Sequence, residues 1–147
     1  MTRSASIKRE TAETSISIEL NLDGTGEHDN NTGYKFMDHM LDLVARHGGI
    51  DLKVEATGDL THHIIEDIAI SLGTCFEEAL GDKRGIRRYG SAYIPMDDAL
   101  ARCVIDFCGR KALILELNLD EECNIEDVAV EDVRHFFNPL AENARMN

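Results

Sequence analysis

Cysteine is scarce in this sequence, and it is not arranged for metal binding. The four cysteines, at positions 75, 103, 108 and 123, form no C-x-x-C pair. Such pairs are the usual signature of zinc sites and redox motifs, so their absence argues against both. We interpret the four as reduced, half-buried thiols of a cytoplasmic protein and not as metal ligands.

Positive charge and long apolar runs are also lacking. There are 15 Lys and Arg residues against 28 Asp and Glu residues, which gives a net charge of −13 and an isoelectric point near 4.7. A strongly acidic chain without a basic run is unsuited to nucleic acid. No apolar stretch approaches the roughly 18 residues of a membrane helix, and residues 1–13 lack a signal-peptide core. We therefore expect a cytoplasmic protein with neither nucleic acid nor membrane as partner.

The residues that are present predict a globular chain of mixed α and β structure. The 147 residues are 43% hydrophobic, which suffices for one ordinary domain with a core. Hydrophobic periodicity and turn residues predict the elements along the chain. Strands are expected at 14–22, 50–59, 91–96, 99–109 and 111–119, helices at 36–49, 62–82 and from 127 onward, and a loop or turn at 23–33.

A weak internal repeat predicts how these elements are organised. DHMLDLVARHG (38–48) and RHFFNPLAENA (134–144) both carry histidine in second place, followed by apolar residues at matching steps. If the match is not chance, His39 and His135 are equivalent positions on two helices. The prediction is an α+β fold made of a duplicated unit, a mixed sheet with helices on one face. Residues 1–84 form the first half, and 85–147 form a second half truncated before its last strand and helix.

The segment GDLTHHIIED (58–67) contains two adjacent histidines with a glutamate in the next turn. Neighbouring residues on a helix point about 100° apart, whereas residues four apart share a face. His62 and Glu66 therefore share one face, and His63 points elsewhere. Two diverging imidazoles suit two separate sites, each of which takes one nitrogen ligand.

Eight blocks along the chain carry a resemblance to a known family. They are RETAET, LDGTG, TGYKFMDHMLDLVARHG, ATGD, HHIIEDIAISLG, EALGDKRGIRRYG, PMDDAL and DFCGR. The blocks resemble those of the imidazoleglycerol-phosphate dehydratases of histidine biosynthesis. The match is collinear over nearly the whole chain, and its DHML, HHxxED and PMD blocks are the most specific.

The resemblance implies a fold, an activity and an assembly. It implies an α+β fold of two similar halves and the conversion of imidazole glycerol phosphate to imidazole acetol phosphate. It also implies two Mn²⁺ sites per subunit, shared between neighbouring subunits, and assembly of trimers into a larger octahedral shell. Imidazole nitrogen and carboxylate oxygen together suit Mn²⁺. A metal on the substrate's ring nitrogen would stabilise the charge left by proton loss beside the ring.

The resemblance also implies roles for individual residues. Glu13 matches an acid or base at the substrate, and Glu66 is assigned to both the catalytic and the metal set. Arg88 and Arg110 match arginines that hold the phosphate, for which a guanidinium fork is well shaped. Two carboxylates, those of Asp97 and Asp106, match supporting residues. The implied metal ligands are His39, His62, His63, Glu66 and His135.

Other features depart from the family pattern. The loop GDLTHH is shorter than usual, Leu43 stands where many members have glutamine, and Cys108 replaces a serine. Pro139 lies inside the last helical stretch and predicts a kink beside His135, because proline removes a backbone hydrogen bond and its ring clashes with a carbonyl one turn earlier. His28, expected in a loop, and His47, near a helix end, are interpreted as ordinary residues without a site role.

The largest departure is at the end of the sequence. Family members continue with a second HHxxE block and a lysine-containing tail, so we expect this chain to hold only part of each metal site. On this ligand count we expect no dehydration by the chain alone. The alternative function is a catalytically incompetent truncated fragment or structural relic of the enzyme. A small metal-binding regulatory module is a third possibility, favoured only by the HHxxED helix.

Overall fold

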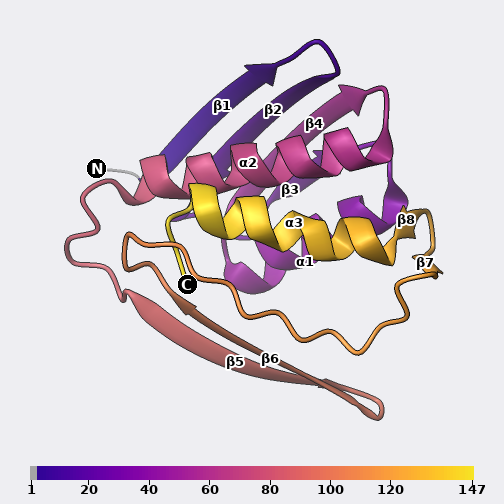
Figure 1. The fold of residues 1–147 in the computed structure, drawn as a ribbon. Coiled ribbons are helices and arrows are strands. Elements are labelled where there is room, and N and C mark those ends of the chain that lie inside the picture. Colours follow the sequence, from indigo (N-terminus) through magenta and orange to yellow (C-terminus); the bar gives the residue numbers. More distant parts are fainter. Residues whose placement is uncertain (1–2) are drawn as a thin grey trace.

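A four-stranded mixed sheet forms one layer of the molecule (Figure 1). The structure, a computed structural model, describes residues 3–147. The strands are β1 (Ser4–Glu10), β2 (Thr14–Asn21), β4 (Asp51–Gly58) and β3 (His28–Asn31), in that spatial order. β1, β2 and β4 pair antiparallel, and β3 lies parallel to β4 at the edge. The predicted mixed sheet is therefore confirmed.

One face of this sheet carries the core. β2 alternates buried and more exposed residues, with Ile16, Ile18 and Leu20 on the inner face. In β4 the inner positions are Leu52 and Val54, both 2% exposed or less. The period of two places these side chains on one side, and the apolar area they remove from water holds the helices onto the sheet.

Two helices cover this inner face. α1 (Lys35–Gly48) buries Met37, Leu41 and Ala45, which recur at four-residue steps along one stripe. It ends at Gly49, whose left-handed φ of 64° lets its N–H donate to the Ala45 carbonyl. α2 (Thr61–Leu80) lies across β1 and β2, with its apolar residues buried nearly all round.

A third helix, α3 (Val130–Asn143), packs alongside α2 (Figure 1). The backbones approach closely at Gly73. A Cβ placed there would meet the Leu140 carbonyl oxygen at 2.8 Å and the Ala144 nitrogen at 2.9 Å. α3 continues through Pro139 as one helix, and the kink expected there remains a prediction. This packing places the first turns of α2 and α3 side by side.

The remaining strands form a hairpin apart from this core. β5 (Tyr89–Met96) and β6 (Ala99–Asp106) pair antiparallel as a two-stranded sheet, and nearly all their side chains are exposed. In Figure 1 the hairpin lies below the helices and projects from them. The short strands β7 (Asn124–Ile125) and β8 (Val128–Ala129) precede α3.

Three expectations need correction. No strand forms at 111–119 within the described chain, because β6 pairs only with β5. The Leu117 and Leu119 carbonyls instead accept hydrogen bonds from the Arg134 guanidinium. The expected loop at 23–33 contains β3, which is stabilised by pairing with β4 despite its Asn- and Asp-rich sequence. β1 was not predicted, although its half-buried Ala5 and Ile7 alternate with exposed residues.

The α+β class is confirmed, and the element order is consistent with a duplicated unit. β1, β2 and α1 are followed later by β5, β6 and α3 in the same sequence of types, with His39 on α1 and His135 on α3. The boundary at residue 84 stays a prediction, since α3 packs directly on α2. None of the helices within residues 3–147 combines the length and the apolar character that crossing a membrane requires.

Candidate metal centre

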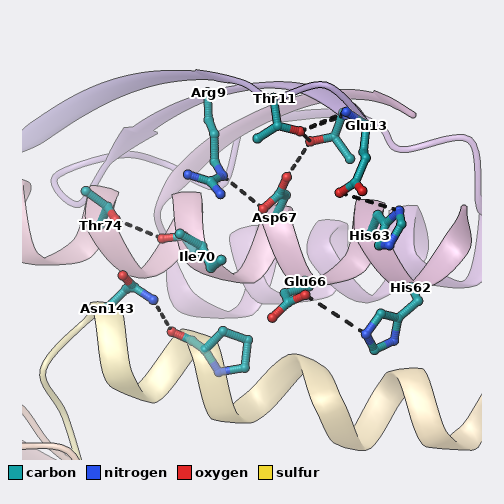
Figure 2. A network of polar contacts seen from close by, with 12 residues as sticks. Arg9, Thr11, Glu13, His62, His63, Glu66, Asp67, Ile70, Thr74 and Asn143 are labelled. Carbon is teal, nitrogen blue, oxygen red and sulfur yellow. Dashed lines mark hydrogen bonds and ion pairs between the residues drawn. The ribbon is translucent and has the colours of Figure 1, made fainter. Parts of the chain in front are cut away.

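Two histidines and a glutamate converge where α2 and α3 begin. His62 and Glu66 come from α2 and His135 comes from α3, and one ligand atom of each lies within 4.8 Å of the others. His135 Nε2 lies 3.3 Å from one Glu66 oxygen, and His62 Nε2 lies 4.0 Å from the other. The His62 and His135 rings face each other with centroids 4.6 Å apart. In Figure 2 His62 and Glu66 both point from α2 toward the α3 ribbon.

Local and tertiary structure both contribute to this cluster. The four-residue spacing of His62 and Glu66 places them on one helix face. His135 reaches that face because α2 and α3 run in the same direction, as paired contacts along them show. Asp132 meets His62, His135 meets Glu66, and Leu140 meets Gly73 farther along.

The donor set fits a divalent cation. His135 Nε2 is shielded from solvent and has no hydrogen-bond partner among residues 3–147, although it faces a carboxylate and a second imidazole. A buried polar atom without a partner is costly, and a bound cation would satisfy it. Imidazole nitrogen with carboxylate oxygen is the donor chemistry that suits such ions, and no cysteine belongs to the cluster.

His63 lies in a different environment on the other side of α2. Its Nδ1 is 2.8 Å from Asp59 Oδ1 and 3.8 Å from Glu13 Oε2 (Figure 2 shows the Glu13 contact). The hydrogen bond to Asp59 raises the pKa of His63 above its usual value, with a further contribution from the Glu13 charge, and it lowers the pKa of Asp59. The two adjacent imidazoles thus diverge into separate surroundings, as their helical geometry requires.

A buried carboxylate ties this part of α2 to the sheet. Asp67 accepts hydrogen bonds from Arg9 Nε of β1, at 2.9 Å, and from the Thr14 hydroxyl of β2. The Thr11 hydroxyl oxygen accepts a hydrogen bond from the backbone N–H of Glu13, at 3.1 Å (Figure 2). This network fixes α2 relative to the β1–β2 turn that carries Glu13.

The remaining predicted site residues lie elsewhere in the described chain. His39 is exposed on α1, beside a hollow that Glu126 and Asp127 also line. Arg88 is held by Asp106 at the base of the β5–β6 hairpin, with Nε 2.8 Å from Oδ1.

Two further predicted residues lie near that hairpin. Arg110 is exposed in the segment after β6. Asp97 sits in the hairpin turn with a φ of 50°. Within residues 3–147, the His62, Glu66 and His135 group is the one set of three that meets metal-ligand spacing.

Sequence reasoning missed two carboxylates that contact the paired histidines. Asp59 precedes His63 by one helical turn, so its contact was accessible from spacing alone. Asp132 contacts His62 from 70 residues away, and no local signal in the sequence indicates that pairing.

Fold and site together define a class: an α+β protein with histidine and carboxylate groups suited to a divalent cation. Residues 32–147 match the family model described as imidazoleglycerol-phosphate dehydratase. The chain belongs to the imidazoleglycerol-phosphate dehydratase family.

Known relatives share this assignment. The chain is 48% identical to the imidazoleglycerol-phosphate dehydratase of Salinibacter ruber, over 99% of this chain and 73% of that protein. It is 51% identical to that of Methanothermobacter thermautotrophicus, over 95% of this chain and 73% of that protein. It superposes on the crystal structure of the Staphylococcus aureus enzyme with a TM-score of 0.84 and 36% identity, over 97% of this chain and 79% of that one.

Proposed function

We propose that the chain carries out a manganese-dependent dehydration, the conversion of imidazole glycerol phosphate to imidazole acetol phosphate in histidine biosynthesis. The observation that carries the proposal is the convergence of His62, Glu66 and His135 in a chain of the dehydratase family. The partnerless His135 Nε2 adds support, because a cation would satisfy it.

Two metal sites would be formed. His62, Glu66 and His135 would hold the first cation, and His63, on the other side of α2, would supply a nitrogen to the second. His39 lies apart from both within one chain, so it would serve a site completed by a neighbouring subunit. When bound, the cation stabilises the negative charge that develops on the substrate's imidazole as the adjacent carbon loses its proton.

The chain's own groups move the protons and hold the phosphate. The reaction removes a carbon-bound proton and a hydroxyl group as water, and the resulting enol becomes the ketone. We assign the proton transfer to Glu13, and the assignment is supported by its exposed carboxylate, whose Oε2 lies 3.8 Å from His63 Nδ1. Arg88 and Arg110 offer guanidinium forks to the phosphate, and Arg88 would exchange its contact with Asp106 for that anion.

Self-association into trimers and a larger octahedral shell is part of the proposal. Support comes from the β5–β6 hairpin, which exposes Tyr93, Ile94, Met96 and Leu100 by more than 60% each. A group of large apolar side chains in contact with water is typical of a surface that another subunit covers. A cytoplasmic location accords with such a biosynthetic role.

The test measures metal binding and ketone formation together. The purified chain is given Mn²⁺ and imidazole glycerol phosphate, and bound manganese is counted per chain. Replacing His62 and His63 with Ala should remove bound metal and any turnover. A His28→Ala, His47→Ala variant is the matched control, because both residues are exposed histidines outside the clusters. Stoichiometric manganese in the His62, His63 variant would contradict the ligand assignment.

One structural observation favours the alternative, an incompetent fragment, for the isolated chain. The first cluster supplies three protein ligands, whereas a site for Mn²⁺ takes about six donors in total. Manganese binding without ketone above background would support that alternative. Turnover comparable to that of a relative would show that the residues present suffice.

A further inference from the structure

Each of the paired histidines has one ring nitrogen held by a carboxylate. Asp132 Oδ1 lies 3.1 Å from His62 Nδ1, and Asp59 Oδ1 lies 2.8 Å from His63 Nδ1. The two carboxylates have different origins, since Asp132 belongs to the first turn of α3 and Asp59 lies just before α2. The same nitrogen is therefore occupied in both rings, although the contacts arise independently.

An ionised carboxylate accepts hydrogen bonds and donates none. It therefore determines which nitrogen of a neutral imidazole carries the proton. Facing Asp132 or Asp59, Nδ1 must carry the hydrogen, and Nε2 then keeps its lone pair. In His62 that free nitrogen is the one directed at Glu66. In His63, Nε2 has no hydrogen-bond partner among residues 3–147.

Burial of Asp132 and a second hydrogen bond to Asp59 distinguish these contacts from chance surface pairs. The Asp132 side chain is 14% exposed, which limits its access to water and to other rotamers. Asp59 is more exposed, but its Oδ1 also accepts the Leu60 N–H at 2.7 Å, so the carboxylate is fixed at the start of the helix. Each acceptor is thus held in place before any ligand binds.

We propose that Asp132 and Asp59 are positioning residues, which hold His62 and His63 in the Nδ1–H tautomer so that each presents Nε2 as a metal ligand. A carboxylate behind a ligating imidazole fixes the ring's orientation and makes the other nitrogen a better donor. The role of Nε2 as a ligand rests on the proposed function. The tautomer and the ring orientation do not, because they are properties of the chain without metal.

The experiment reads the ring nitrogens directly. The ¹⁵N-labelled full chain, without metal, is studied by NMR at a pH well above the ordinary histidine pKa, and His62→Ala and His63→Ala spectra assign the signals. Both rings should carry their proton on Nδ1. Asp132→Ala should turn His62 into a mixture of tautomers and leave His63 unchanged. Asp59→Ala, which removes the acceptor at Nδ1, should turn His63 into a mixture of tautomers and leave His62 unchanged.

A matched control and a second readout complete the test. Glu131→Ala removes one charge from the same turn of α3 without touching either ring, so both tautomers should persist. Mn²⁺ affinity, measured by calorimetry, should fall roughly 10- to 100-fold in the Asp132 and Asp59 variants and stay unchanged in Glu131→Ala.

The two possible failures can be distinguished. A wild-type ring protonated on Nε2, or a His62 tautomer indifferent to Asp132→Ala, would overturn the positioning role. If both rings show the expected tautomers and respond to the variants but the wild-type chain binds no manganese, the positioning of the rings holds and the proposed metal-dependent function fails.

Discussion

Arg9 on β1 and Asp67 on α2 form an ion pair, with Nε 2.9 Å from Oδ1, between positions 58 residues apart in the sequence. The same carboxylate accepts the hydroxyl of buried Thr14 on β2. Asp67 thereby connects the helix that carries His62, His63 and Glu66 to two strands of the sheet. The contact makes the position of the candidate site dependent on the sheet.

Removing this carboxylate should destabilise the protein measurably. Asp67→Ala removes the charged acceptor of the buried Thr14 hydroxyl, which keeps the Thr11 hydroxyl at 3.1 Å as a partner, whereas Arg9, 38% exposed, can recover hydration. A hydrogen bond to a charged group contributes about 1.5–3 kcal/mol, and we expect a loss of that size in urea unfolding. Glu10→Ala is the control, because it breaks an exposed pair with Lys8 that solvent screens, so its effect on unfolding should be much smaller. Equal effects of the two variants would refute the structural role of Asp67.

Gly73→Ala should destabilise the contact between α2 and α3. Alanine normally improves a helix by about 1 kcal/mol relative to glycine. Here its Cβ would lie 2.8 Å from the Leu140 carbonyl oxygen, and backbone cannot move aside as easily as a flexible side chain. Overpacking costs roughly 1–3 kcal/mol, so the clash should outweigh the gain in helix propensity.

The control for Gly73 is another helical glycine. Gly48 ends α1, and an added Cβ would meet only the Ile50 side chain, at 3.7 Å. Gly48→Ala should therefore leave the thermal midpoint unchanged or raise it, while Gly73→Ala lowers it. A rise in both variants would show that the helices are packed more loosely than the structure indicates.

The start of α1 should be sensitive to Asp127 and to acid. Asp127 accepts the backbone N–H groups of Lys35 and Phe36, and these bonds, that of Phe36 foremost, lower the pKa of Asp127 below its usual value. A carboxyl with a depressed pKa stabilises the fold above its unfolded pKa of about 3.9, and the stabilisation is lost as pH falls through the lower folded value.

Thermal melts across pH test the role of Asp127. Asp127→Ala should melt below wild type at neutral pH, and the difference should shrink below about pH 4, as the wild-type carboxyl protonates. Glu126→Gln removes the neighbouring exposed charge and should melt like wild type. A difference that stays constant down to low pH would rule out the ionised cap.

The four cysteines should differ sharply in reactivity. Burial raises the pKa of the Cys75 thiol to about 12, and the residue is fully buried in the core. Cys103 and Cys123 are exposed free thiols, so the expectation of half-buried thiols holds only for Cys108. Since the thiolate is the reactive form, a disulfide reagent at mildly alkaline pH should modify Cys103 and Cys123 quickly and Cys75 only upon unfolding. A Cys75→Ala variant should lose only the slow step; rapid modification of Cys75 in the native chain would contradict its burial.

Local sequence determined a large part of this fold. The stripe Met37, Leu41 and Ala45 and its glycine stop predict α1, and alternation predicts β2 and β4, because each pattern is set by the geometry of a single element. The spacing of His62 and Glu66 likewise fixes their shared face. Resemblance to the family added His135 as a candidate ligand, which the structure brings next to Glu66.

Tertiary structure alone decided the rest. β3 forms from His28–Asn31, which shows no apolar alternation, because β4 supplies partners for its backbone. Residues 111–119 alternate clearly but find no partner among the described strands. The contact of Asp132 with His62 spans 70 residues, and that of Asp127 with Lys35 spans 92. Periodicity reports which face of an element is apolar, but it carries no information on which distant element packs there. That choice depends on the packing of the whole chain.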